Sequence, residues 1–172
     1  MKPTDPTQHR LGRGMIVLAW VLALGLLTVF FDELLGWREN PNQRLQSSVE
    51  GGVREVVLQQ NFQGHYVAPG TINGHPVVFL LDTGATTVSV PAALGPRLEL
   101  SPGPAQPVST ANGVITVYTT RIDDLGLGPI HLRGVRAHLN PRMDGDVVLL
   151  GMSAMRQLEL VQRGETLTLR QY

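Results

Sequence analysis

The residue with the clearest chemical potential is Asp82, in the run Leu81-Asp82-Thr83-Gly84-Ala85. Apolar, strand-forming residues surround it, which predicts a carboxylate at the end of a sheet, where an unpaired charge is costly. Two such carboxylates a hydrogen bond apart cannot both ionise comfortably, so they share one proton. The pair then supplies the base and the acid that a reaction with activated water needs. The plainer interpretation of Asp82-Thr83-Gly84 is a polar β-turn.

Other polar residues give weaker signals. Asp144-Gly145-Asp146 is not followed by enough oxygen ligands at EF-hand spacing, so a solvated turn is favoured over a calcium loop. Asp123-Asp124 is interpreted likewise as a strand or hairpin end. The histidines after residue 60 lack H-x-x-x-H spacing, and no serine stands in a G-x-S-x-G elbow. We therefore expect no metal site and no cofactor.

A β-hairpin is predicted to deliver the chain into Asp82. The strand-prone runs 66–72 and 77–81 flank Asn73-Gly74, and both residues of that pair tolerate positive φ. A hairpin at this point makes Asp82 the first residue after its second strand.

The rest of the domain is predicted as short strands separated by glycine and proline. A second pair, Asn112-Gly113, predicts another hairpin. The uninterrupted apolar run 147–150, which ends at Gly151, predicts a strand buried on both faces. Further strands are predicted over 53–58, 86–90, 108–111, 114–118, 121–127, 130–132, 135–139 and 166–169, with short helices over 92–94 and 152–158.

The N-terminal region contains an uncharged run of eighteen residues, 14–31. As a helix rising about 1.5 Å per residue, it nearly spans a hydrocarbon core of ~30 Å. Basic residues precede the run and acidic residues follow it, so 1–13 is predicted to be cytoplasmic, 14–31 a transmembrane signal anchor, and everything after residue 31 periplasmic or extracytoplasmic. A cleaved signal peptide is the alternative, but the run does not end in the small residues of a cleavage site. Segment 32–52 is predicted as a linker and 53–172 as one domain.

Composition favours a β-rich domain and argues against two classes of function. Nineteen glycines and twelve prolines among 172 residues imply frequent turns. A formal net charge of zero, without basic residues interleaved with aromatics, argues against a nucleic-acid partner. The absence of cysteine removes disulfides, thiolate metal sites and cysteine nucleophiles together.

With these residues the chain resembles the retropepsin-like aspartic proteases, in particular bacterial membrane-anchored members that carry Asp-Thr-Gly-Ala. The resemblance covers about residues 64–158. It rests on the hairpin into 79–86, the β-branched run after it, the 110–113 hairpin, and 149–152 ahead of a short helix. It implies an all-β fold, the closed-barrel half of an acid protease, preceded by one transmembrane helix.

The resemblance also implies a role for each matching position. Asp82 is the catalytic residue, and because the chain carries one Asp-Thr-Gly, the carboxylate pair requires a C2 homodimer. Thr83 holds the two loops together across the axis, Gly84 lets the backbone approach the carboxylate and substrate, and Ala85 replaces a hydroxyl residue. The remaining implied residues are the substrate-binding flap, Ala111, Asn112, Gly113 and Val114, and the loop supports, Leu150 and Gly151. An ordinary surface hairpin is the alternative interpretation of the flap.

The resemblance predicts a membrane-anchored aspartic endopeptidase that hydrolyses polypeptides outside the cytoplasmic membrane. One departure concerns the dimer, because terminal strands of two chains interleave in retroviral relatives, whereas segment 160–172 is short and partly polar here. A membrane anchor would compensate for a weaker dimer interface, because it raises the local concentration of chains. The alternative function is a non-catalytic peptide-binding or dimerisation module with the same fold.

Overall fold

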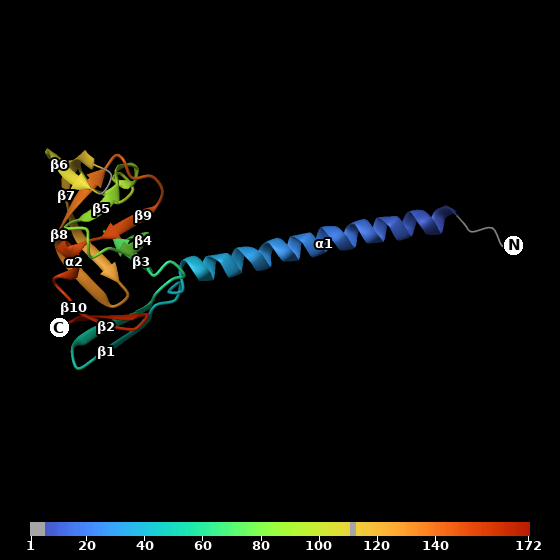
Figure 1. Cartoon of the computed structure of the whole chain (residues 1–172), viewed down its shortest axis with the longest axis horizontal. Helices are drawn as coiled ribbons and strands as arrows, with labels where there is room; N and C mark the ends of the chain where they lie inside the picture. The colour runs from blue at the N-terminus through green and yellow to red at the C-terminus, as the bar shows by residue number, and fades with distance from the viewer. Residues whose placement is uncertain (1–5, 111–112) are drawn as a thin grey trace. The chain divides into compact units, whose positions relative to one another are not determined.

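The computed structural model describes residues 6–110 and 113–172 and divides the chain into two units, Met1–Arg38 and Glu39–Tyr172 (Figure 1). Helix α1 (Pro6–Glu39) covers the predicted span 14–31. In the described part of the chain, however, no helix is both long enough and apolar enough to cross a membrane. The structure therefore does not support the predicted transmembrane helix.

The second unit consists mostly of strands, which confirms the predicted β-rich class. Its first strand, β1 (Gln46–Glu50), lies inside the segment predicted as a linker. The further elements are β2 (Val53–Gln59), β3 (Tyr66–Ile72), β4 (His75–Leu81), β5 (Val88–Pro91), the 3-10 helix η1 (Ala92–Leu94), β6 (Ala105–Thr110), β7 (Gly113–Leu127), β8 (Ile130–Asn140), β9 (Val147–Leu150), α2 (Met152–Met155), β10 (Glu159–Arg163) and β11 (Thr166–Gln171).

The described strands form two sheets. The larger has the order β3-β4-β9-β5-β8-β7-β6 and the smaller the order β1-β2-β11-β10. A short pairing of Thr71 with Gly126 and Ile72 with Leu125 joins β3 to β7, so the larger sheet curves back onto its first strand. Full closure into a barrel stays a prediction. In Figure 1 the blue-green β1 and β2 lie at the same end of the domain as β10, and β11 pairs with β2 between them, so both ends of this domain are in the smaller sheet.

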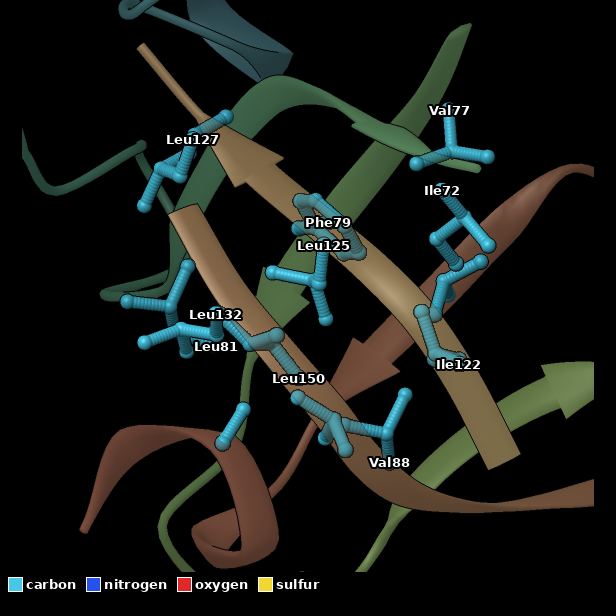
Figure 2. Close-up of a cluster of buried hydrophobic side chains, with 14 of the residues drawn as sticks. Ile72, Val77, Phe79, Leu81, Val88, Ile122, Leu125, Leu127, Leu132 and Leu150 are labelled. Atoms are coloured by element: carbon cyan, nitrogen blue, oxygen red, sulfur yellow. The ribbon is translucent and has the colours of Figure 1, made fainter. Parts of the chain in front are cut away.

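One hydrophobic core is shared by the two sheets. Figure 2 shows Phe79 of β4 and Leu125 of β7 near its centre, and both are at most 1% exposed. Alternate residues of a strand face the same side, so β2 and β11 each direct two side chains into this core, namely Val56, Leu58, Leu167 and Leu169. Each large apolar side chain contributes roughly 1.5–3 kcal/mol on burial. The smaller sheet is thus an integral layer of the domain.

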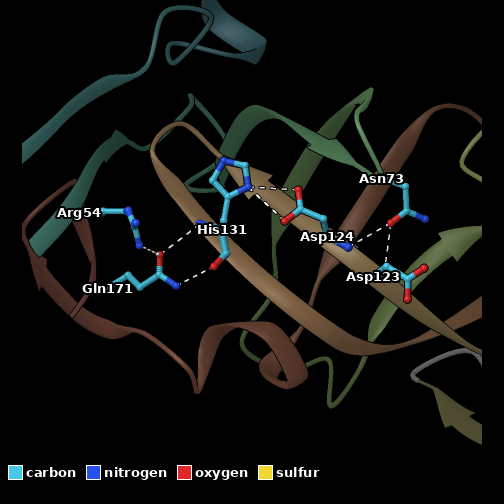
Figure 3. Close-up of polar contacts among 6 residues, drawn as sticks. All are labelled: Arg54, Asn73, Asp123, Asp124, His131 and Gln171. Carbon is cyan, nitrogen blue, oxygen red and sulfur yellow. Dashed lines mark hydrogen bonds and ion pairs between the residues drawn. The ribbon is translucent and has the colours of Figure 1, made fainter. Parts of the chain in front are cut away.

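Polar contacts also fasten the smaller sheet to the larger (Figure 3). The Gln171 side chain donates to the carbonyl oxygen of His131 at 2.6 Å and accepts from its N–H at 3.1 Å. Arg54 of β2 donates to the same Gln171 oxygen at 3.3 Å. On β7, Asp124 lies 3.1 Å from the ring of His131. These contacts link β2 and β11 to β8 and β7.

The hairpin that leads into Asp82 forms as predicted. Its turn residues, Asn73 and Gly74, have φ values of 50° and 82°. The Asn73 side-chain oxygen accepts from the N–H groups of Asp123 and Asp124 at 3.2 and 3.1 Å, as Figure 3 shows. Its side-chain nitrogen donates to the carbonyl oxygen of Leu98 at 2.9 Å. The far end of the hairpin is therefore anchored, which fixes the strand that precedes Asp82.

Several strand boundaries differ from the prediction. The short strands expected across 114–139 are two long ones, β7 and β8, because their ladder keeps its register on both sides of Gly134. The expectation that 147–150 is buried on both faces is wrong at Val147, which is 40% exposed. The helix expected over 152–158 ends at Met155. Strand β10 was not predicted, because its polar residues lack the alternation of a half-buried strand.

Candidate active site

Asp82 directly follows β4 and is half-buried. Its N–H donates to the carbonyl oxygen of Leu150 at 3.2 Å. One carboxylate oxygen accepts a hydrogen bond from the N–H of Gly84 at 2.9 Å, and the N–H of Ala85 donates to the carbonyl oxygen of Asp82 at 3.2 Å. The 82–85 turn thus orients its own carboxylate through the backbone, which leaves the second carboxylate oxygen for chemistry.

The segment after β9 supports this turn through backbone contacts. Strands β4 and β9 run parallel, with Leu81 opposite Leu150. The N–H of Met152 then donates to the carbonyl oxygen of Ala85 at 2.8 Å. A side chain on Gly151 could not fit, because its Cβ would lie 2.7 Å from the Ala85 oxygen. The structure therefore brings the predicted support residues, Leu150 and Gly151, against the turn that carries Asp82.

Ser153 also holds this region together, and the sequence analysis did not identify it. Its side chain is buried; it donates to the carbonyl oxygen of Arg136 at 2.7 Å and accepts from the N–H of Val88 at 3.0 Å. Its N–H donates to the carbonyl oxygen of Thr86 at 3.0 Å. Ser153 thus joins the start of β5 to β8 behind the turn. The available signal was a single hydroxyl within an apolar stretch, because a buried polar group needs partners.

A cavity of about 410 Å³ opens on one side of Asp82, within the usual range for ligand sites. Polar side chains from β5 and β8 line it, including Ser89, His138 and Asn140. Burial lowers the pKa of His138, so the neutral ring is favoured there. Residues of the β6–β7 hairpin line another part of the wall, namely Val108, Ser109, Thr110, Ile115 and Val117.

A second cavity, of about 490 Å³, also borders Asp82. Thr83 lines it together with Tyr66 of β3 and two residues of β10, Leu160 and Gln162. Burial raises the pKa of Tyr66, and the Gln60 side chain opposes part of that rise. Among the described residues that line the two cavities, Asp82 is the one carboxylate. It borders both.

The predicted flap is only partly placed. Ala111 and Asn112 lie outside the described residues. Gly113 has a φ of 107° and begins β7, while Val114 is 73% exposed and does not line the described cavity. The residues of the hairpin that do line it stand on either side of the tip and include three in succession on β6, so strand alternation alone would not have found them.

Three comparisons place the chain among known proteins. The sequence profile of the gag-polyprotein putative aspartyl proteases matches residues 68–157. The chain is 32% identical over 181 residues to an uncharacterised protein in the cobV 5' region of Sinorhizobium sp., covering 95% of this chain and 76% of that protein. It is similar in fold to a retropepsin-like aspartic protease from Rickettsia conorii, with a TM-score of 0.59, 23% identity, and coverage of 73% of this chain and 96% of that one.

The matched profile begins in β3 and ends just after α2, so it contains most of the hairpin, the Asp82 turn and the segment that supports it. More than half of the chain lies within this match. The fold of the domain is retropepsin-like. The chain belongs to the gag-polyprotein putative aspartyl protease family.

Proposed function

We propose that this chain is an aspartic endopeptidase whose active site forms in a homodimer from Asp82 of each subunit. The observation that carries this proposal is the placement of Asp82. It is half-buried, oriented by the Gly84 N–H at 2.9 Å, and adjacent to both cavities. Membership of an aspartyl protease family supports the same chemistry.

The mechanism needs two carboxylates that share one proton. The ionised Asp82 takes a proton from a water molecule, whose oxygen attacks the carbonyl carbon of the peptide bond. The protonated Asp82 of the partner subunit gives its proton to the carbonyl oxygen. Collapse of the tetrahedral intermediate breaks the C–N bond, and the leaving nitrogen receives a proton from the pair. One chain cannot perform these steps, because no other carboxylate lines the described cavities.

The substrate class that fits this site is an extended polypeptide. The 410 Å³ cavity lies between the Asp82 turn and the β6–β7 hairpin, and its lining combines apolar side chains with hydroxyl, amide and imidazole groups. β6 is also an edge strand of the larger sheet in the described chain. A peptide beside such elements can pair through its backbone while alternate side chains enter the cavity.

Attachment to a membrane, and action on its periplasmic side, remain proposals that rest on the sequence alone. They are supported by the uncharged run 14–31 and by the basic residues before it. Extraction of cell membranes with alkaline carbonate distinguishes a chain anchored in the membrane from a chain that is not. An anchored chain stays in the membrane pellet, whereas a chain found only in the soluble fraction contradicts the anchor.

The experiment that tests the enzymatic proposal is cleavage of an unstructured protein by the full chain. Asp82→Asn should abolish cleavage while the circular dichroism spectrum and melting temperature stay unchanged. Asp144→Asn, in an exposed turn, is the matched control and should cleave normally. Cleavage that survives Asp82→Asn contradicts the mechanism. A native chain that binds peptides and never cleaves them would be the non-catalytic module instead.

A further inference from the structure

The 410 Å³ cavity beside Asp82 has a polar wall on the larger sheet. Ser89 of β5 and His138 of β8 stand directly opposite each other in the parallel ladder of these strands, and both line the cavity. Asn140, two residues further along β8, lines it as well. Because alternate residues of a strand share one side, His138 and Asn140 lie on the same side of the sheet. We call Ser89, His138 and Asn140 the polar wall.

The residues between these positions face the hydrophobic core. Val88 and Val90 of β5 and Ala137 of β8 belong to the core and are at most 2% exposed. Ser89 and His138, in contrast, are half-buried. A substitution at either of these two positions therefore changes the lining of the cavity and leaves the core side chains in place.

Asn140 offers a hydrogen-bond donor whose orientation is fixed. Its side-chain oxygen accepts from the N–H of Arg142 at 2.9 Å, and this contact assigns the two ends of the carboxamide. Its side-chain nitrogen makes no hydrogen bond to any residue that the structure describes, and it remains accessible. The N–H groups of Asn140 are therefore available to a ligand in the cavity.

Ser89 and His138 add both kinds of hydrogen-bonding group. Burial lowers the pKa of His138, and a neutral imidazole ring has one donor and one acceptor nitrogen. The hydroxyl of Ser89 donates to the sulfur of Met143 at 3.4 Å, so its oxygen can still accept a hydrogen bond. The polar wall thus presents donors and acceptors together, without a formal charge.

The charges around the cavity select against ionised side chains. Its described lining contains no lysine or arginine, and Asp82 is its one carboxylate. A substrate carboxylate would meet the charge of Asp82 without a cation to offset it. A substrate cation would pair with Asp82 and withdraw that carboxylate from the reaction. An apolar side chain would leave the groups of the polar wall without partners.

A carboxamide side chain satisfies all of these conditions. It is neutral, and it carries two N–H donors and one carbonyl acceptor. The rest of the described lining includes four apolar side chains, three from the β6–β7 hairpin and one from β9, namely Val108, Ile115, Val117 and Leu149. These can pack against the methylene groups between a carboxamide and its backbone.

We propose that the polar wall is the specificity-determining part of this site and binds a glutamine or asparagine side chain of the polypeptide substrate. The substrate carbonyl oxygen accepts from the Asn140 N–H, and the substrate amide nitrogen donates to the Ser89 oxygen or to the acceptor nitrogen of His138. This inference rests on the proposed function, because it names the sequences that such an endopeptidase selects.

Peptide binding to the full chain in detergent tests the preference. The chain carries Asp82→Asn so that it cleaves nothing, and fluorescence anisotropy measures its affinity for two pools of peptides. Both pools have random flanking residues, and the central residue is glutamine in one and methionine, of similar length, in the other. We expect the glutamine pool to bind roughly tenfold tighter, because a site built to hydrogen-bond a group rejects an analogue that lacks it.

Two further substitutions in the same chain make the polar wall apolar. Ser89→Val and His138→Leu should each remove most of the preference for glutamine and tighten binding of the methionine pool. A misfolded variant cannot bind the methionine pool more tightly, so this gain identifies a change in the site. His75→Leu is the matched control, because this half-buried histidine lies 3.2 Å from Glu99 and lines neither cavity. It should retain the preference.

Equal binding of the two pools by the chain with the polar wall intact overturns the inference. An unchanged preference in both Ser89→Val and His138→Leu overturns it as well.

Cleavage by the native chain is measured separately, so that the two proposals fail separately. In a digest of unfolded proteins, glutamine and asparagine should be enriched at one fixed distance from the cleaved bond. A chain that prefers the glutamine pool but cleaves nothing refutes the proposed function and leaves the polar wall as a binding site. A chain that cleaves through Asp82 but binds both pools equally refutes the inference about the polar wall alone.

Discussion

Gly151 and Ala85 approach each other so closely that a Cβ on Gly151 would lie 2.7 Å from the carbonyl oxygen of Ala85. The same hypothetical atom would lie 2.5 Å from the carbonyl oxygen of Thr87. Both neighbours are backbone oxygens, one in the turn that carries Asp82 and one just before β5, and neither can rotate aside. The glycine therefore lets the end of β9 support that turn.

Gly151→Ala should destabilise the domain and displace the turn. We expect the free energy of unfolding to fall by about 1–3 kcal/mol, the usual cost of overpacking. Urea unfolding followed by circular dichroism measures this change. Gly25→Ala is the control, because a Cβ there meets no atom within 4 Å. Equal urea midpoints for Gly151→Ala and the native chain would contradict the described contact.

Ser153→Ala should cost about 1–3 kcal/mol of folding stability, because it leaves the buried N–H of Val88 without its 3.0 Å acceptor. The carbonyl oxygen of Arg136 loses a donor at the same time. Ser48→Ala, in the exposed strand β1, is the matched serine control and should change stability little. Calorimetric melting of the two variants checks this prediction, and similar melting temperatures would show that Ser153 has no such role.

His138 should make folding stability depend on pH. Burial lowers its pKa in the folded domain below the ordinary histidine value of about 6.5, so the unfolded chain binds this proton first as pH falls. The contribution of neutral His138 to the free energy of unfolding is then fully present above about pH 6.5. It decreases below that pH and stops changing once His138 is protonated in the folded domain as well. His138→Gln should lose this part of the pH dependence.

Denaturant unfolding across this pH range measures the effect, with His65→Gln, at an exposed position just before β3, as the control. If the free energies of unfolding of the native chain and of His138→Gln depend on pH in the same way, the described burial of His138 is contradicted.

The sequence predicted the parts of the fold that depend on short-range signals. Asn73-Gly74 specified its hairpin because both residues adopt positive φ there. Asp82 was identified because a carboxylate between apolar strands is unusual. The run ending at Gly151 was expected beside Asp82 only through the family resemblance, and the structure shows the backbone contacts behind that placement.

Features that depend on pairing between residues distant in the sequence could not be predicted from short-range signals. Gln46–Glu50 and Glu159–Arg163 look polar and irregular, and they are strands because β2 and β11 pair with them. Ser153 acts through Arg136 and Val88, which are distant in sequence. The cavity-lining positions of the flap hairpin depend on which face of β6 and β7 turns inward, and the pattern of residues does not specify that face.

The central claim is that cleavage requires Asp82 from two chains, and a dimer with one native subunit tests it most directly. Native and Asp82→Asn chains are produced together with different affinity tags, and the protein that carries both tags is purified in two steps. Each such dimer contains one Asp82. We predict activity of about 1% or less of the doubly tagged native dimer, because the carboxylate pair is incomplete. Activity of about half the native value would mean that each chain cleaves alone and would contradict the account.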